Sequence, residues 1–140
     1  MSEVGADGHD ATASMYAADR VAHEMGMTVV EAEPGRATVE MVVRDEMTNG
    51  LGVCHGGLVF TLADTAMAYA SNAGEHRAFS TSASIEWVRS AISGDELRAT
   101  CHTVETRGRN AIHDTVVVNG AGETVALVRG HTLAVDSRAS

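Results

Sequence analysis

The sequence predicts an α+β fold, in which an antiparallel sheet of about six strands wraps around one long central helix and a further helix lies at the N-terminus. Two observations predict it. Short runs rich in Val and Thr are separated by turn-forming residues, which is typical of antiparallel strands. After the second run, an apolar segment of about four helical turns is hydrophobic on almost every side, and a helix with that pattern is a buried one.

Local patterns place each element along the chain. A rough apolar stripe predicts the first helix, and Pro34-Gly35 joins the first two strands as a hairpin. Gly-containing turns divide the last four strands, which we expect to pair in succession as a meander. The expected bounds are a helix over Asp10–Met25, strands over Met27–Glu33 and Arg36–Val43, a loop over Arg44–His55, the central helix over Gly57–Ala73, and strands over Ala78–Val88, Glu96–Glu105, Asn110–Val118 and Thr124–Val135.

Length and composition limit the class of protein. The 140 residues predict a single domain over residues 1–140 with a core of about residues 10–135, and residues 1–9 and Ser137–Ser140 are expected to be frayed ends. A net charge of −9 argues against a nucleic-acid partner, because phosphate binding needs clustered Lys and Arg. No signal-peptide core is visible, and the most apolar stretch is too short to span a bilayer. We therefore expect a cytoplasmic protein with no membrane partner, and free thiols at Cys54 and Cys101.

Two features of the central helix could do chemistry. At its start, Gly56-Gly57 would let a ligand approach backbone N–H groups that have no partner within the helix, and such groups stabilise an oxyanion. The alternative is that the glycines only permit a tight turn. Two turns later, Asp64 stands among apolar residues, where burial raises the pKa of a carboxyl and suits it as a general base. The alternative is a carboxylate on a partly solvated helix face.

The spacing of these two features predicts more than one chain. Gly56 and Asp64 would lie about 12 Å apart along one helix, whereas a reacting carbonyl must be about 3 Å from both its attacker and its oxyanion donor. Two antiparallel helices related by a twofold axis could supply both groups to one site. If the residues are catalytic, the protein is expected to be a homodimer with interfacial active sites.

Two polar residues precede the helix. The Asn49 amide could orient a water molecule, and His55 could anchor the loop or polarise a carbonyl. The alternatives are that Asn49 only forms a turn with Gly50 and that His55 only bonds backbone. No recognisable metal-ligand spacing occurs among the other histidines, so no metal site is expected.

Taken together, these segments resemble the signature of the hotdog-fold acyl-CoA thioesterases, nearest to the phenylacetyl-CoA thioesterase (PaaI-type) family. The similarity covers roughly residues 10–135, and Ser90 departs from the proline that many members have after Arg89. The segments that carry it are Asn49-Gly50, His55-Gly56-Gly57, Leu62-Ala63-Asp64, Ala70-Ser71-Asn72, Ser84–Arg89 and Gly94–Leu97.

The resemblance implies a homodimer, commonly doubled to a homotetramer, that hydrolyses an acyl-CoA to the free acid and CoA. Asp64 matches the family carboxylate that acts as general base or nucleophile, Gly56 matches the backbone donor to the thioester carbonyl, and Asn49 and His55 match its polar helpers. Related hydroxybenzoyl-CoA thioesterases often carry Glu at the position of the catalytic carboxylate and Thr one helical turn later. Asp64 and Ala68 stand there in this chain, which favours arylacetyl-CoA of the phenylacetyl-CoA or hydroxyphenylacetyl-CoA type. No cofactor is expected, because CoA is part of the substrate.

Some alternatives stay open. Arg89, Arg107 and Arg109 could hold the CoA phosphates, or could be solvated surface charges. A hotdog hydratase or dehydratase acting on acyl thioesters would need a catalytic His and acid, which His55 and Asp64 approximate loosely. A non-catalytic acyl-CoA binding module would have no obvious use for Asp64.

Overall fold

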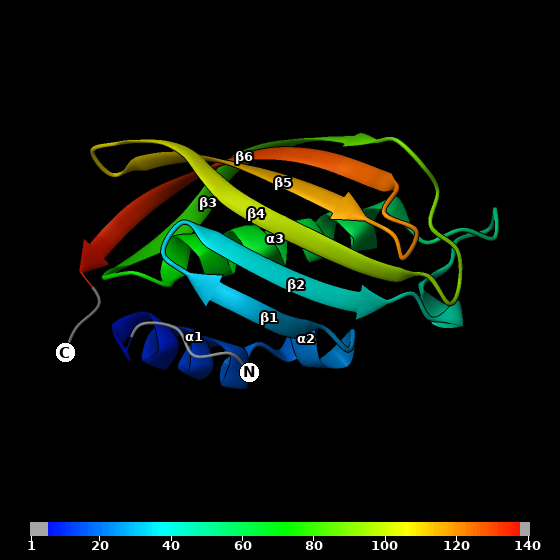
Figure 1. Ribbon diagram of the computed structural model, residues 1–140, viewed down its shortest axis with the longest axis horizontal. Coiled ribbons are helices and arrows are strands. Elements are labelled where there is room, and N and C mark those ends of the chain that lie inside the picture. Colours follow the sequence, from blue (N-terminus) through cyan, green and yellow to red (C-terminus); the bar gives the residue numbers. More distant parts are fainter. Residues whose placement is uncertain (1–5, 138–140) are drawn as a thin grey trace.

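The computed structural model describes residues 6–137, so the outer parts of both expected frayed ends, 1–5 and 138–140, lie outside the described residues. One six-stranded antiparallel sheet curves around α3, which lies behind it in Figure 1, and the predicted architecture is confirmed. The elements are α1 Ala6–Ala18, α2 Arg20–Glu24, β1 Thr28–Glu33, β2 Arg36–Val42, the 3-10 helix η1 Asp45–Met47, α3 Gly56–Asn72, β3 His76–Trp87, β4 Glu96–Arg107, β5 Asn110–Val118 and β6 Thr124–Ser137.

The strand order is β1-β2-β4-β5-β6-β3, and it corrects the expected meander of four strands. Only β4, β5 and β6 pair in succession, while β3 pairs with β6, from His76–Ser137 to Trp87–Ala126, and β4 pairs with β2. The reason is the path of α3, which carries the chain under the concave face of the sheet. β3 therefore starts at the edge opposite β1, and β4 returns to β2.

As an edge strand, β3 exposes an unusual amount of apolar surface. Most of its side chains are exposed on both faces, and Phe79 and Trp87 are 58% and 55% exposed. An edge strand also presents one row of unpaired backbone N–H and C=O groups, which readily pair with another strand. In the single chain, β3 thus has one open edge, and most of its side chains are exposed although some contact α3.

The N-terminal region is two helices, so the prediction of one helix over Asp10–Met25 is wrong. α1 begins at Ala6, inside the segment expected to be frayed, and the chain breaks at Asp19. The Asp19 Oδ1 atom accepts a hydrogen bond from the Ala22 N–H at 3.1 Å and so caps α2. Asp prefers such a cap to a helix interior, because its side chain satisfies an orphan backbone donor.

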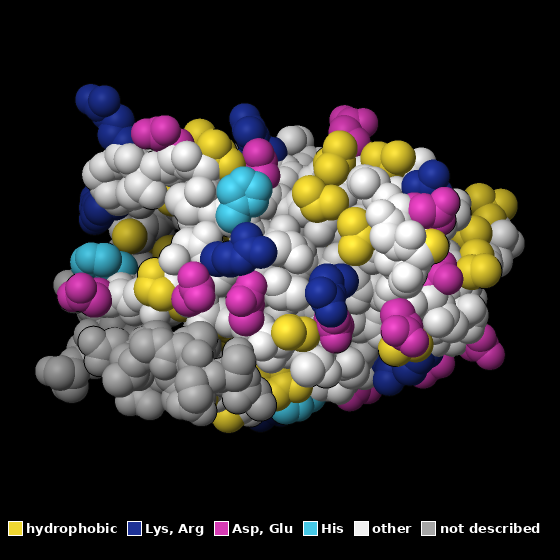
Figure 2. All heavy atoms as spheres, in the orientation of Figure 1, with side chains coloured by type: hydrophobic (Ala, Val, Ile, Leu, Met, Phe, Trp, Pro, Cys, Tyr) yellow, Lys and Arg dark blue, Asp and Glu magenta, His cyan; other side chains and the backbone are white. Residues whose placement is uncertain are grey.

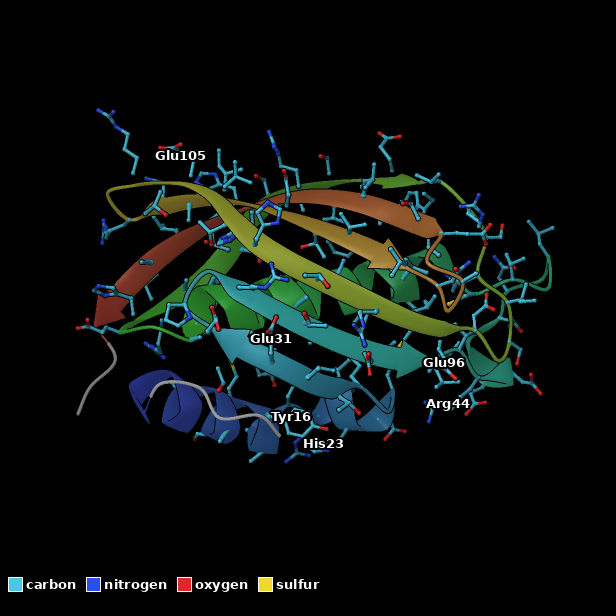
Figure 3. The ribbon with its side chains drawn as sticks, viewed as in Figure 1. Tyr16, His23, Glu31, Arg44, Glu96 and Glu105 are labelled. Atoms are coloured by element: carbon cyan, nitrogen blue, oxygen red, sulfur yellow. The ribbon has the colours of Figure 1, made fainter. Side chains whose placement is uncertain are left out.

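The two short helices lie alongside β1, at the lower edge of the sheet in Figure 1. Figure 3 labels Tyr16 of α1 and His23 of α2, whose ring centroids are 4.4 Å apart. The Tyr16 hydroxyl donates to the Met27 carbonyl oxygen at 2.8 Å, and the Tyr69 hydroxyl of α3 donates to Asp19 Oδ2 at 3.1 Å. These bonds tie the N-terminal helices to the sheet and to α3.

Only part of α3 is buried by its own chain. Val59, Leu62, Ala63, Ala66, Met67, Tyr69 and Ala70 are among the buried residues of the core. The face formed by Gly57, Thr61, Asp64, Ala68 and Ser71 is half-buried or exposed. The expectation of burial on every side is therefore wrong for the single chain, although the apolar pattern that led to it is present.

The loop between β2 and α3 is more ordered than expected. It contains η1, and an isolated bridge pairs Thr48 with Cys54. The Cys54 N–H donates to the Ala91 carbonyl oxygen at 2.7 Å, and the His55 N–H donates to the Met47 carbonyl oxygen at 2.8 Å. These bonds tie the approach to α3 to the connection between β3 and β4 and to η1.

The outer face of the sheet, seen in Figure 2, mixes apolar side chains with charges of both signs. Val42, Val104, Ile112 and Leu127 are exposed on β2, β4, β5 and β6. Among the described residues, no helix is long and apolar enough to cross a bilayer.

Candidate active site

The first turn of α3 presents two backbone donors. His55 is the N-cap, and its carbonyl oxygen accepts hydrogen bonds from the Leu58 N–H at 2.9 Å and the Val59 N–H at 3.3 Å. The N–H groups of Gly56 and Gly57 make no hydrogen bond within the described part of the chain. They stand at the positive end of the helix dipole, so the turn can stabilise a negatively charged oxygen.

A tryptophan from the edge strand lies against this turn. Trp87, the last residue of β3, donates its Nε1–H to the Gly56 carbonyl oxygen at 3.1 Å. A Cβ built at Gly56 would lie 3.1 Å from both Cε2 and Nε1 of the indole. An alanine at position 56 would therefore crowd the indole, and this constraint is steric, since the φ angle of Gly56 is not in the left-handed region.

Asp64 is half-buried, and it faces β3. The Ser80 hydroxyl donates to Asp64 Oδ1 at 3.4 Å. Burial raises the pKa of Asp64 above its ordinary value, and the hydrogen bond from Ser80 opposes that rise. A carboxylate that is half-buried yet not ion-paired within the described residues has the character of a general base or nucleophile.

Removing the Ser80 hydroxyl is expected to change the pH dependence of the reaction. Ser80→Ala removes the bond that lowers the pKa of Asp64, so that pKa rises further. For a carboxylate that acts in its ionised form, the acid limb of kcat/KM then shifts to higher pH, while the plateau at high pH changes little. A pH–rate profile measures this. Ser84→Ala, on the same strand, is the matched control, and an unshifted or downward-shifted limb in Ser80→Ala contradicts the assignment.

Asn49 and His55 lie in the loop before α3 and at its N-cap. Asn49 Oδ1 accepts from the Leu51 N–H at 2.9 Å and the Val53 N–H at 3.4 Å, so the carbonyl end of the amide closes the loop. Its Nδ2 group makes no hydrogen bond to any described residue, which leaves that donor for a ligand or a second chain. The His55 side chain is exposed and caps nothing. The backbone carbonyl of His55 accepts hydrogen bonds in the first turn of α3, and its exposed side chain is left at the start of the helix.

Gly56 and Asp64 do not meet in one chain. They lie on the same helix about 12 Å apart along its axis, as their spacing requires. The chain thus carries both chemical groups but does not bring them to one point.

The three candidate arginines are divided between the two ends of the molecule. Arg89 follows β3 at the Gly56 end, where it donates to the Thr124 carbonyl oxygen at 2.8 Å and pairs with Glu123 at 3.8 Å. Arg107 ends β4 and Arg109 lies in the β4–β5 turn, beside the C-terminal end of α3. One chain therefore does not gather the three side chains around a single phosphate site.

Cys54, Cys101 and His113 are buried in the core. Cys54 and Cys101 are free and buried, and burial raises the pKa of both thiols, which keeps them protonated. His113 is buried between the Thr103 and Thr132 hydroxyls at 2.9 and 2.7 Å. Within residues 6–137, no group of His, Cys, Asp and Glu could hold a metal ion.

Reasoning from sequence missed Ser80 and Trp87 as site residues. Both lie on β3, and their contacts depend on which edge of the sheet that strand occupies. The run of small hydroxyl residues around Ser80, in a strand otherwise rich in apolar residues, was the available signal. The sequence separation between this run and Asp64 does not indicate that the two are in contact.

Comparisons with known proteins agree with this geometry. The sequence profile of the thioesterase superfamily matches residues 51–126. The acyl-coenzyme A thioesterase PaaI of Escherichia coli K12 is 38% identical over 117 residues, covering 84% of each chain. The structure of the E. coli PaaI protein from the phenylacetic acid degradation operon superposes with a TM-score of 0.92 at 33% identity, covering 96% of this chain and 97% of that one.

A further solved structure, the Streptococcus mutans UA159 protein smu.793 bound to acetyl-CoA, superposes with a TM-score of 0.77. It is 26% identical and covers 81% of this chain and 91% of that one. The predicted resemblance and the hotdog fold are thus confirmed, as is the prediction of an enzyme that hydrolyses thioesters. The chain, with its Gly56 turn and Asp64 on one central helix, belongs to the thioesterase superfamily.

Proposed function

We propose that the protein hydrolyses arylacetyl-CoA thioesters of the phenylacetyl-CoA or hydroxyphenylacetyl-CoA type to the free acid and CoA. The observation that carries the proposal is the pairing of a half-buried carboxylate of raised pKa with unpartnered Gly amides on one helix. The substrate class is supported by the likeness to the E. coli acyl-coenzyme A thioesterase PaaI, a protein of the phenylacetic acid degradation operon. The same likeness supports a role in phenylacetate degradation, which we propose takes place in the cytoplasm.

The chemistry uses Asp64 and Gly56 in complementary roles. The thioester carbonyl oxygen accepts the Gly56 N–H, which stabilises the negative charge that develops on it as the carbonyl carbon is attacked. Asp64 either takes a proton from an attacking water or attacks the carbon itself, forming an anhydride that water then hydrolyses. In both routes the C–S bond breaks and CoA leaves as the thiolate, which takes up a proton.

The site requires a second chain, and three features support a homodimer with interfacial active sites. Gly56 and Asp64 are too far apart on one helix to act on one carbonyl. The α3 face that contains Asp64 is left half-open by its own chain. β3, whose Ser80 and Trp87 contact the two groups, has an open edge and exposed faces.

Antiparallel pairing of two α3 helices would place the Gly56 turn of one chain beside Asp64 of the other. We propose that two such dimers form a homotetramer, which the exposed apolar residues on the outer face of the sheet support.

CoA enters and leaves as part of the substrate, and no other cofactor is proposed. The acetyl-CoA bound to the S. mutans relative supports recognition of the CoA portion. Arg89 lies at the Gly56 end of its own chain and is proposed to contact the CoA phosphates. Arg107 and Arg109 lie at the opposite end, so in an antiparallel dimer they would serve the site that contains the partner's Gly56 turn. Asn49 Nδ2 and His55 are proposed as further polar contacts at the mouth of the site.

A substrate panel tests the proposed function. Purified protein is incubated with phenylacetyl-CoA, 4-hydroxyphenylacetyl-CoA, benzoyl-CoA, hexanoyl-CoA and crotonyl-CoA, and CoA release is followed with a thiol reagent. The expected result is the highest kcat/KM with the two arylacetyl thioesters. Preference for a straight acyl chain would overturn the substrate class but keep the enzyme. Hydration of crotonyl-CoA without CoA release would indicate a hydratase, and binding without turnover would indicate a binding module.

A further inference from the structure

Trp87 occupies an unusual position for an edge-strand aromatic residue. It is the only tryptophan of the chain, and it stands at the very end of β3. The strand is fixed there, because Trp87 pairs with the buried Ala126 of β6 and the next residue, Val88, donates its N–H to the Val125 carbonyl oxygen at 2.8 Å. The indole is thus held by the sheet while its N–H reaches the first residue of α3.

The contact is close and specific to the Gly56 backbone. The indole Nε1–H donates to the Gly56 carbonyl oxygen at 3.1 Å, and the ring edge fills the space that a Cβ at position 56 would need. More than half of the Trp87 surface is exposed, so the ring contributes little burial to the core of the single chain. Hydrophobic burial alone therefore does not account for Trp87, because its indole N–H donates to this carbonyl oxygen.

The bonded carbonyl matters because of the peptide unit to which it belongs. The Gly56 carbonyl and the Gly57 N–H share one planar peptide group, so fixing the oxygen fixes the direction of that N–H. Hydrogen bonds in series polarise one another, so donation to the oxygen also makes the N–H a stronger donor. The preceding peptide is fixed in the same way, because the His55 carbonyl accepts from Leu58 and Val59 and carries the Gly56 N–H on its far side.

We propose that Trp87 is a positioning residue that orients and polarises the Gly56–Gly57 peptide, so that Gly57 supplies a second backbone donor to the thioester oxygen beside Gly56. The inference rests on the proposed function, in which this turn stabilises the oxyanion. It adds to that function a second donor, the Gly57 N–H, and a residue on a different element that holds this donor in place. The catalytic turn is then built by α3 and β3 together.

The test removes the indole N–H while keeping an aromatic ring. Trp87→Phe is expected to lower kcat for phenylacetyl-CoA by about 3- to 10-fold, the range of one hydrogen bond, and to change KM by less than about 2-fold. Because Trp87 is the sole tryptophan, replacing it during expression with benzothienylalanine exchanges only the N–H for sulfur and keeps the ring size. That protein is expected to lose kcat to the same extent. Val88→Ala, an exposed neighbour, is the matched control.

A second variant separates positioning from general damage. Gly56→Ala brings a Cβ against the indole and is expected to lower kcat by about 10-fold. In the Trp87→Phe background the same change is expected to cost less than about 3-fold, because the indole atoms that crowd the Cβ are absent. Light scattering and a thermal melt check that each variant keeps its assembly state and fold.

The outcomes distinguish this inference from the function on which it rests. If the wild-type protein releases no CoA, the proposed function fails and the role of Trp87 fails with it. If the wild type is active and the benzothienylalanine protein has an unchanged kcat, the function stands and the positioning role is overturned. Equal penalties for Gly56→Ala in both backgrounds would also overturn it. A lower kcat at nearly unchanged KM in the Trp87→Phe and benzothienylalanine proteins, together with a smaller penalty for Gly56→Ala in the Trp87→Phe background, supports it.

Discussion

Replacing Asp64 with asparagine is expected to lower kcat for thioester hydrolysis by about 10²-fold or more. The amide has nearly the shape of the carboxylate but can neither accept a proton nor attack the carbonyl carbon. KM is expected to change much less, since the group acts in the transition state and not in holding the CoA portion. The measurement is CoA release from phenylacetyl-CoA, followed with a thiol reagent in wild type and variant.

The control for this prediction is that the Asp64→Asn protein keeps the fold and the assembly state of the wild type. A half-buried carboxylate of raised pKa is already costly to keep ionised, so a neutral asparagine is expected to leave the melting temperature unchanged or higher. Light scattering should give the same assembly state for both proteins. An Asp64→Asn protein that hydrolyses the substrate at the wild-type rate would keep the enzyme but remove Asp64 from its mechanism.

Gly130→Ala is expected to destabilise the protein by about 1–3 kcal/mol, which is the usual cost of overpacking a core. Gly130 is buried on β6 between β5 and β3. A Cβ built there would lie 2.1 Å from Met67 Sδ and 2.7 Å from its Cε. Sδ and Cε are the flexible end of the Met67 side chain, but Met67 is 1% exposed, so that end can turn away only by displacing neighbouring core residues. Chemical denaturation of the purified protein measures the change in the free energy of unfolding.

Gly120→Ala provides the matched control, because no atom lies within 4 Å of a Cβ built at that position. Its free energy of unfolding is expected to stay within about 0.5 kcal/mol of wild type. Met67→Ala should cost less in the Gly130→Ala background than alone, since it then removes the clash as well as the packing. Equal stability of Gly130→Ala and Gly120→Ala would contradict the close approach of α3 to β6.

The central helix and the hairpin could be predicted because their signals are local. The alternation of Ala37, Val39, Met41 and Val43 reports burial on one face of a strand, and all four are buried. The first helix was mispredicted as one element because a helical stripe continues past Asp19. Whether that residue stays in the helix or caps a new one depends on the hydrogen bonds that its two carboxylate oxygens accept, Oδ1 from the Ala22 N–H and Oδ2 from the Tyr69 hydroxyl.

The sequence by itself determined the kind of chemistry. Local patterns placed a carboxylate on an apolar helix and glycines at the start of that helix, and the spacing of Gly56 and Asp64 predicted a second chain. It could not determine which residues support those groups. Ser80 and Trp87 reach Asp64 and Gly56 only because α3 carries the chain to the far edge of the sheet, where β3 pairs with β6. Strand order is decided by which faces can be buried together, a property of the whole packed chain that no local pattern contains.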